Sequence, residues 1–364
     1  MPAINAATIT AFYLFDVAEQ IDLPSVRSAV GDAATAVRLT GGRGAPSYLQ
    51  YARPPVVVDS DALGFGAFDG FKGRIKFFDY GVLSLGLSRP FAGEWSDLVA
   101  ASQRYIENDT LEEKAEACCR SLMARFPSAM RGVRGKFLAE DYLVLAVTSL
   151  ERSSTADELI ASRGREIAQI LRGELQILST QEQEDILRNR LSYLPDDLVI
   201  PTWNASFIYD TEAGAHAALE IVEFANSQLL EFRYYDELLD VELGRIYAQL
   251  QQPHWWDTLS GRGYIRAAHQ LNALFIDVNE ITDQTQNALK MVGDIYAAKL
   301  FHLTASRLGL EPWKASVAEK LTTLNEIYRF AVEQVAISRG QFLELTIIAI
   351  LILELVLFFM GIMT

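Results

Sequence analysis

Cysteine and histidine are scarce in this chain of 364 residues. The two cysteines, Cys118 and Cys119, are adjacent, and adjacent cysteines form neither a disulfide framework nor the spaced ligand pairs of a zinc site. The four histidines are scattered along the chain, without an HExxH pair. We therefore expect no metal and no cofactor, and the low cysteine content is typical of a reducing compartment.

Recognisable catalytic motifs are missing as well. The glycine-rich loop at residues 41–44 (GGRG) lacks the GK[ST] ending of a P-loop and the spacing of a dinucleotide fingerprint. The chain contains no G-x-S-x-G nucleophile elbow, and its cysteines and histidines suggest no nucleophile–base pair. The sequence predicts a protein that is not an enzyme.

Basic residues are absent from the first 26 positions, where the chain begins MPAINAATIT and reaches its first arginine at Arg27. Such an N-terminus has neither the basic flank of a secretory signal nor the arginine-rich character of a transit peptide. Residues 1–140 carry 15 basic and 16 acidic side chains, a net charge of −1, whereas residues 141–364 carry 17 and 31, a net charge of −14. The acidic half would repel phosphate backbones, so direct nucleic-acid binding is not expected.

Long apolar runs are absent until the end of the chain, where residues 343–363 are apolar apart from Glu344, Thr346, Glu354 and Gly361. From residue 345 the run forms about 28 Å of helix, close to the ~30 Å hydrocarbon core of a bilayer. We predict a single C-terminal transmembrane helix in the inner (cytoplasmic) membrane, with the N-terminal bulk in the cytoplasm. Arg329 and Arg339 precede the run, in agreement with this orientation. The alternative is a buried core or oligomer helix.

Glu354 interrupts that apolar run. A charge at the bilayer centre costs about 2.5–3.5 kcal/mol, so an intramembrane glutamate requires a partner or a proton. Helical spacing places four residues on its face: Ile347, Ile350, Phe358 and Gly361. We predict that this face forms the contact of a homo-oligomer. The alternative is a proton or ion pathway.

The remaining pattern predicts an α+β (or α/β) N-terminal domain followed by a mainly helical region. Strand-like segments occupy residues 75–87 and 137–150, and helical segments lie between them. Heptad spacing in the region 271–303, answered by 313–335 after a short connection, predicts a long antiparallel helical hairpin. The predicted domains are a mixed α/β domain at 1–152, a helical domain at 153–263, a coiled-coil-like stalk at 264–342 and the transmembrane helix at 343–363.

Two further features indicate contacts with a partner. No acidic residue lies between Glu116 and Glu140, where five cations form a possible patch for an acidic protein, anionic lipid or RNA: Arg120, Arg125, Arg131, Arg134 and Lys136. A solvated surface is the alternative. A smaller basic set is formed by Lys72, Arg74 and Lys76, which alternate at the start of a strand and therefore lie on one face.

The second feature is a turn that would anchor packing or contact a partner: Pro253, Trp255 and Trp256.

Several segments together resemble the family named for "required for meiotic nuclear division" (Rmd/Sif type), as a bacterial-type member. They are residues 78–82 (FDYGV), the helix at 162–178, residues 226–236 (NSQLLEFRYYD), residues 253–256 (PHWW) and the C-terminal helix with Glu354. The resemblance implies a membrane-anchored, oligomeric, non-enzymatic scaffold that presents its α/β domain to a protein or ribosomal partner.

A CorA-like ion channel is the alternative from another functional class. It shares the order of an α/β head, long helices and C-terminal spans, and it would use the intramembrane Glu354. Such a channel requires a second span and a Gly-Met-Asn motif, and residues 360–362 (MGI) are the nearest approach to that motif.

Overall fold

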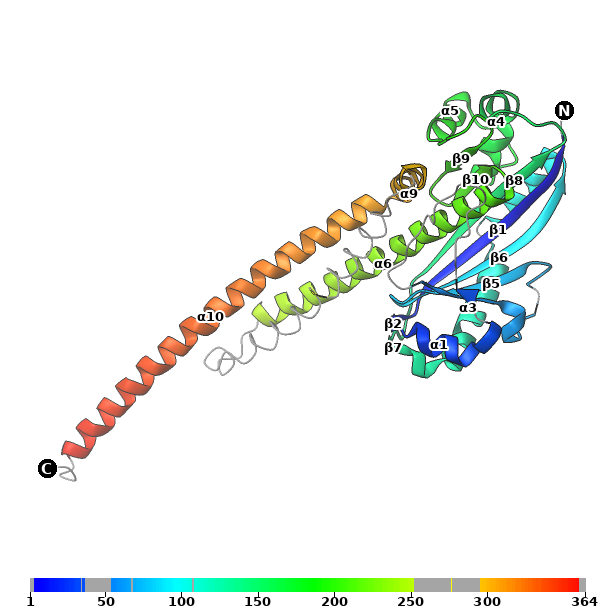
Figure 1. Cartoon of the computed structure of the whole chain (residues 1–364). Coiled ribbons are helices and arrows are strands. Elements are labelled where there is room, and N and C mark those ends of the chain that lie inside the picture. The colour runs from blue at the N-terminus through cyan, green and yellow to red at the C-terminus, as the bar shows by residue number, and fades with distance from the viewer. Residues whose placement is uncertain are drawn as a thin grey trace. The chain divides into compact units, whose positions relative to one another are not determined.

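The computed structural model describes residues 3–33, 35–36, 54–66, 68–106, 108–251, 276 and 295–359. The chain divides into two compact units. The first comprises Met1–Tyr234 and Gln284–Trp313, and the second comprises Tyr235–Asp283 and Lys314–Thr364. Figure 1 shows the N-terminal part as a mixed α/β domain with a large sheet, and helices follow it along the chain.

An eight-stranded sheet forms the body of the first unit, in the order β3-β4-β5-β6-β1-β8-β10-β9. Its strands are β1 (Ile4–Asp16), β3 (Thr35–Ala36), β4 (Val56–Asp59), β5 (Lys72–Phe77), β6 (Val82–Gly93), β8 (Ala139–Leu150), β9 (Leu198–Pro201) and β10 (Ala205–Tyr209). Neighbours in the sheet are antiparallel except β8 and β10, which are parallel. A separate ribbon pairs β2 (Ala18–Ile21) with β7 (Met130–Val133).

β1 lies at the centre of the sheet, between β6 and β8. Its β-branched and aromatic residues favour a long strand, and successive side chains point to opposite faces. Ile9, Tyr13 and Phe15 belong to the apolar core on one face. Thr10 and Asp16, which are also buried, lie on the other face. The two faces of the sheet therefore differ in polarity from its central strand outward.

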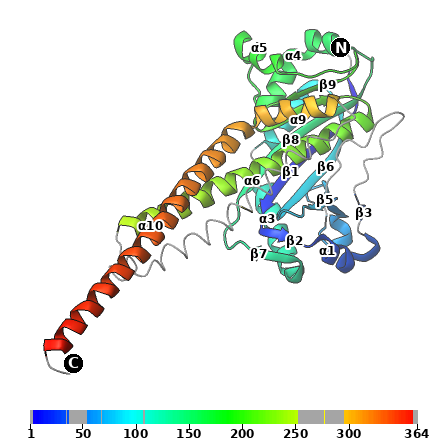
Figure 2. The ribbon, with the colours of Figure 1, turned by 60° about the vertical axis from the view of Figure 1, so that its left-hand side comes forward.

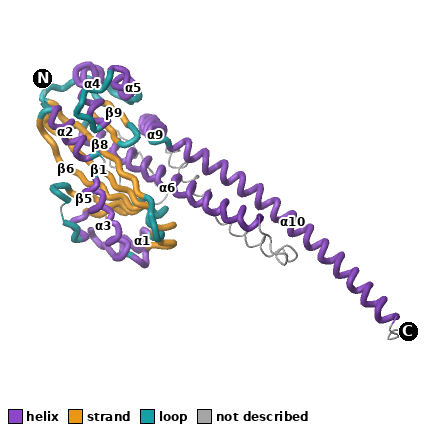
Figure 3. Tube along the Cα trace, turned by 180° about the vertical axis from the view of Figure 1, so that it is seen from behind, coloured by secondary structure: helices purple, strands orange, loops and turns teal. Residues whose placement is uncertain are grey.

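Helices α2 (Trp95–Tyr105), α3 (Asp109–Arg125) and α4 (Ala156–Arg172) cover the apolar face, and Figure 3 shows α2 and α3 in front of the strands. α1 (Leu23–Val30) and α5 (Thr180–Arg188) also belong to this unit. The Trp95 ring lies 6.1 Å from the ring of Phe207 in β10. A capping box at Thr155 and Glu158 starts α4. The chain thus returns from β8 through α4 and α5 to β9 and β10, which is why β10 can run parallel to β8.

The other face of the sheet is covered by α6 (Glu212–Gln251), whose part up to Tyr234 belongs to the first unit. Figures 1 and 2 both show α6 lying across the strands. α9 (Ile295–Arg307) packs beside it, with the rings of Phe224 and Phe301 5.6 Å apart. Val222 and Leu230 of α6 are completely buried. Alongside these apolar residues, α6 buries an unusual number of charged ones.

The second unit joins the end of α6 to α10 (Leu310–Phe359). Lys320 Nζ lies 2.8 Å from Asp236 Oδ1 and 2.7 Å from Asp240 Oδ1. The hydroxyl of Ser316 donates to Asp236 Oδ1 at 2.6 Å. The predicted partner of α10 is the heptad segment at 271–303, and residues 271–275 and 277–294 of it lie outside the described residues.

The predicted domain boundaries fall at different places in this architecture. The boundary at residue 152 lies between β8 and α4, inside the first unit, and the sheet continues beyond it with β9 and β10. The boundary at residue 263 lies outside the described residues. The boundary at residue 342 lies within the continuous helix α10.

No helix among the described residues is long and apolar enough to cross a membrane. The predicted transmembrane helix at 343–363 is therefore wrong, and so are the single-pass inner-membrane location and the membrane-anchored scaffold derived from it. Glu344 and Glu354 bracket nine residues, 345–353, which form only about 14 Å of helix. A bilayer core requires about 30 Å. The channel alternative, which relied on Glu354 inside a membrane, fails for the same reason.

Candidate functional site

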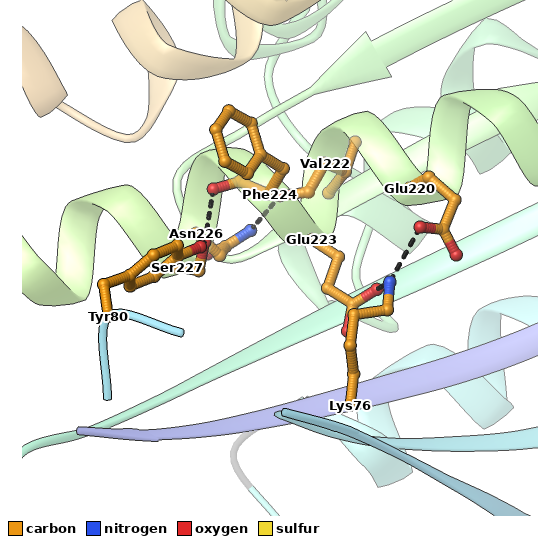
Figure 4. A network of polar contacts seen from close by, with 8 residues as sticks. All are labelled: Lys76, Tyr80, Glu220, Val222, Glu223, Phe224, Asn226 and Ser227. Carbon is orange, nitrogen blue, oxygen red and sulfur yellow. Dashed lines mark hydrogen bonds and ion pairs between the residues drawn. The ribbon is translucent and has the colours of Figure 1, made fainter. Parts of the chain in front are cut away.

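A line of polar side chains on α6 faces the sheet and is buried there. Its members lie three or four residues apart, which places them on one side of the helix: Glu220, Glu223, Ser227 and Glu231, each 3% exposed or less. Three residues from the strands and their connections face them, namely Lys76, Tyr80 and Arg134, and Asp16 of β1 pairs with Arg134. We call these eight residues the polar seam, and Figure 4 shows the part of it between Glu220 and Ser227.

The first group of the polar seam has one lysine between two glutamates. Lys76 of β5 is 2% exposed, and its Nζ lies 2.7 Å from Glu220 Oε2 and also contacts Glu223. Burial acts to lower the pKa of Lys76, but Glu223 and Glu220 outweigh it and raise that pKa. Burial raises the pKa of Glu223, and Lys76 opposes this effect. The group holds α6 to β5 through a cation that stays charged.

The second group is uncharged and centres on Tyr80, in the turn between β5 and β6. Its hydroxyl lies 2.7 Å from Ser227 Oγ, and Ser227 in turn donates to the carbonyl of Phe224 at 2.8 Å. Because the single hydroxyl proton of Ser227 is used there, Tyr80 is the donor to Ser227. Burial holds the pKa of Tyr80 well above its ordinary value, so the phenol keeps this proton.

Gly81 makes the approach of Tyr80 to α6 possible. Its φ is 97°, in the region that favours glycine, and a Cβ built there would lie 1.8 Å from the carbonyl oxygen of Ala18. The backbone of β2 therefore passes directly against this turn. Any side chain at residue 81 would force the two segments apart and shift Tyr80 away from Ser227.

The third group contains one arginine, two buried carboxyl groups and a tyrosine ring. Arg134, which follows β7, forms an ion pair with Asp16 of β1. Its guanidinium carbon also lies 3.2 Å from the centre of the Tyr234 ring, a cation–π geometry. Glu231 is completely buried, and neither of its carboxyl oxygens has a hydrogen-bond partner among the described residues. Burial is the main cause that raises the pKa of Glu231, to about 8.

Chemically, this arrangement is suited to holding a helix against a sheet. Among the described residues, no group of three or more histidine, cysteine or acidic side chains is placed to hold a metal ion. Cys118 and Cys119 lie in α3, on the opposite side of the sheet. Burial raises the pKa of the Cys118 thiol to about 12 and that of Cys119 further still, so neither forms a thiolate readily.

The structure distributes the predicted basic patch over several environments. Arg134 is 8% exposed and belongs to the polar seam. Arg120 pairs with Glu116 on α3, and Arg125 Nη1 donates to the carbonyl of Leu63 at 2.6 Å. Arg131 and Lys136 are exposed. A patch for an acidic partner at these five positions stays a prediction, with Arg134 turned away from solvent.

The predicted oligomer contact lies on α10, where Ile347 is 55% exposed, Ile350 is 51% exposed and Glu354 is exposed. Phe358 belongs to α10, and its side chain lies outside the description. Gly361 and the turn with Pro253, Trp255 and Trp256 lie outside the described residues. Of the five residues of the predicted contact, the structure therefore describes the side chains of Ile347, Ile350 and Glu354.

Sequence reasoning missed most of the polar seam. The alternation of Lys72, Arg74 and Lys76 was noted, but the partners of Lys76 are about 145 positions away, at Glu220 and Glu223. A usable signal was the spacing of Glu220, Glu223, Ser227 and Glu231 on a helix whose neighbouring positions are apolar. Polar residues in such a stripe resemble a solvated face, although here the stripe faces the sheet.

Comparisons with known proteins identify relatives of the α/β part. Residues 6–216 match the family described as "Uncharacterized protein MJ0711, N-terminal domain". Over 207 residues the chain is 25% identical to "Uncharacterized protein MJ0711" of Methanocaldococcus jannaschii. That alignment covers 56% of this chain and 62% of the archaeal protein, so the chain spans less than two thirds of this relative's length. No solved structure matches the chain.

These findings correct the expected family. The predicted resemblance to the "required for meiotic nuclear division" family is wrong, because the matching family model is a different one. The motif at residues 78–82 meets a local requirement, since Gly81 has a φ of 97° in the turn, and such a requirement does not define a family. The match at residues 6–216 covers more than half of the chain, and the protein belongs to the family of the MJ0711 N-terminal domain.

Proposed function

We propose that this protein acts by associating with copies of itself through the end of α10, and that its α/β unit is a non-catalytic body. The observation that carries the proposal is the exposure of nine large apolar side chains between residues 343 and 356. Each is between 45% and 62% exposed: Leu343, Ile347, Ile348, Ile350, Leu351, Ile352, Leu353, Leu355 and Val356. Contiguous apolar surface of this kind on a soluble protein marks an interaction site.

The distribution of these side chains favours a second copy of the chain as the partner. They lie on all sides of the helix, because consecutive positions such as residues 350–353 point in different directions. One facing helix covers only one stripe, so a bundle of at least three α10 segments suits this pattern better than a pair. Isoleucine-rich core positions favour three- and four-stranded bundles over dimers. The face with Ile347, Ile350 and Glu354 is the proposed centre of the contact.

The α/β unit supports the non-catalytic part of the proposal. Lys76 is held by Glu220 and Glu223, and Arg134 is held by Asp16 and Tyr234. Tyr80 is engaged with Ser227. Lys76, Arg134 and Tyr80 are thus engaged in internal contacts, which suits a structural role.

The oligomeric state of the full-length chain tests this proposal. We expect light scattering in detergent-free buffer to give a defined multiple of 40.6 kDa, three or higher. The double variant Ile350→Asp/Leu351→Asp should reduce the mass to that of a monomer, because it introduces charges into the contact. The matched control is Ile177→Asp, at a side chain that is 67% exposed in the first unit, and it should leave the mass unchanged.

Three results would overturn the proposal. One is a monomer for the unaltered chain over the whole accessible concentration range. Another is a defined oligomer whose mass the double variant does not change. The third is an aggregate of unbounded size, because a closed bundle has a fixed number of copies.

A further inference from the structure

Glu231 differs from the other buried carboxyl groups of the polar seam because, among the described residues, it forms no ion pair. Arg134 is the cation that acts on Glu231 electrostatically, and it is paired with Asp16 and stacked on Tyr234. Glu220 and Glu223, in contrast, both contact Lys76. The two oxygens of Glu231 have no hydrogen-bond partner among the described residues, and the side chain is completely buried.

The groups around Glu231 come from three other elements. Asp79 and Tyr80 face it from the turn between β5 and β6, and Arg134 faces it from the segment after β7. Asp16 of β1 lies behind Arg134. With Glu231 ionised, this region holds one cation against two fully buried carboxylates, with Asp79 as a further negative charge beside them. An unpaired buried carboxylate costs several kcal/mol, so the neutral acid is the form compatible with a packed α6.

We propose that Glu231 is a proton-operated latch: with its proton, the turn of α6 from residue 228 to residue 234 packs against the sheet, and loss of the proton releases that turn. Two features produce this behaviour. Glu231 is held in place by α6, and Arg134 already forms an ion pair with Asp16 of β1. In the packed state, ionised Glu231 has no ion-pair partner. When the turn moves toward solvent, water hydrates the carboxylate.

The direction of the pH dependence follows from the two states. Burial and Asp79 raise the pKa of Glu231 to about 8 in the packed state, although Arg134 opposes them. In the released state the pKa approaches ~4.3, the value of an exposed glutamate. The packed state is therefore fully favoured below pH ~4, loses its advantage as the pH rises, and loses no more above pH ~8, where both states are ionised. Between pH 6 and pH 8 the opening equilibrium should increase about 50-fold.

Hydrogen exchange of the full-length chain tests the latch. After correction for the intrinsic pH dependence of exchange, amides in peptides covering residues 225–236 should open about 50-fold more readily at pH 8 than at pH 6. In Glu231→Gln the increase should vanish, because glutamine has the same shape and no proton to lose. The matched control is Glu220→Gln, which weakens the Lys76 group and should leave the alkaline increase at residues 225–236 intact.

A spectroscopic measurement remains decisive if a variant does not fold. Infrared difference spectra of the unaltered chain should show the band of buried protonated carboxyl groups at pH 6, and its intensity should fall as the pH is raised to 9. Glu223, whose pKa burial also raises, contributes to any band that remains. Absence of the band at pH 6, or an intensity that does not change between pH 6 and pH 9, would overturn the proposal. So would an exchange increase in Glu231→Gln equal to that of the unaltered chain.

Discussion

The two faces of the central sheet are buried by different chemistry, although each is covered by helices of the same chain. On the face of α2, α3 and α4, the buried side chains are almost all aliphatic or aromatic, with Leu145, Trp95 and Phe207 among them. On the face of α6, charged groups are buried in the same layer, including Lys76, Glu220, Glu223 and Glu231.

This difference separates two ways of fixing a helix on a sheet. Apolar contacts are non-directional and roughly proportional to buried area, so they tolerate substitutions that conserve volume. Buried ion pairs are directional, and breaking one leaves an uncompensated charge. The apolar face should therefore supply stability that does not depend on pH, whereas the α6 face should define the position of the helix and respond to pH.

Lys76→Ala is expected to have the largest effect, because it leaves Glu220 and Glu223 buried without their cation. Loss of one partner from a buried ion pair costs about 3–5 kcal/mol, measurable as the free energy of unfolding in urea at pH 7. The control on the same strand is Lys72→Ala, whose exposed side chain should contribute less than about 0.5 kcal/mol.

The pH dependence of that cost sharpens the comparison. Without Lys76, burial raises the pKa of both glutamates, and a group with a raised carboxyl pKa loses stability as the pH increases. The penalty of Lys76→Ala should therefore be smaller at pH 5 than at pH 7. A penalty that is equal at the two pH values would contradict the idea that charge, rather than packing, decides this face.

Leu145→Ala probes the apolar face with a smaller expected cost of about 2–4 kcal/mol, from lost burial and a residual cavity. Leu145 lies on β8 with no exposure, so the whole side chain contributes. Because no titratable group takes part, urea unfolding should give the same penalty at pH 5, 7 and 9. If the penalty changed with pH, the separation of the two faces would fail.

The local elements were largely predictable from the sequence, and the arrangement of the sheet was not. The predicted strand-like segments at 75–87 and 137–150 coincide with β5, β6 and β8. Hydrophobic periodicity reports only on neighbours in the chain. It does not show that β1 lies between β6 and β8, or that β10 joins β8 as a parallel partner across about 60 residues.

The polar seam was hidden for a related reason. Glu220, Glu223 and Glu231 have the spacing of one helix face, and a charged face is normally solvated. The three-dimensional structure shows that this face is buried, with each of the three glutamates 3% exposed or less and Lys76 opposite Glu220 and Glu223. The apolar end of α10 led to the opposite error, because its composition predicted burial in a membrane. No described helix is long and apolar enough to span one.

Tyr80→Phe should have the smallest effect, and it shows whether the uncharged middle of the polar seam behaves like the charged groups beside it. The change removes the hydroxyl that donates to Ser227 Oγ and that also bonds the Gln228 side chain, while the Ser227 proton keeps its bond to the Phe224 carbonyl. A neutral hydrogen bond of this kind contributes about 0.5–1.5 kcal/mol. Because burial keeps Tyr80 protonated, the loss should be constant from pH 6 to pH 9.

Tyr193→Phe, at a ring that is 71% exposed, is the control and should leave the free energy of unfolding unchanged. Urea unfolding of both variants at pH 6 and pH 9 distinguishes the contribution of a neutral hydrogen bond from that of the charged groups. A constant loss for Tyr80→Phe, next to the pH-dependent loss at Lys76, would show that the pH response of the α6 face comes from its carboxyl groups alone. A loss that shrank toward pH 9 would instead mean that the hydroxyl of Tyr80 helps to keep the nearby Glu231 protonated. The second and third groups of the seam would then be coupled.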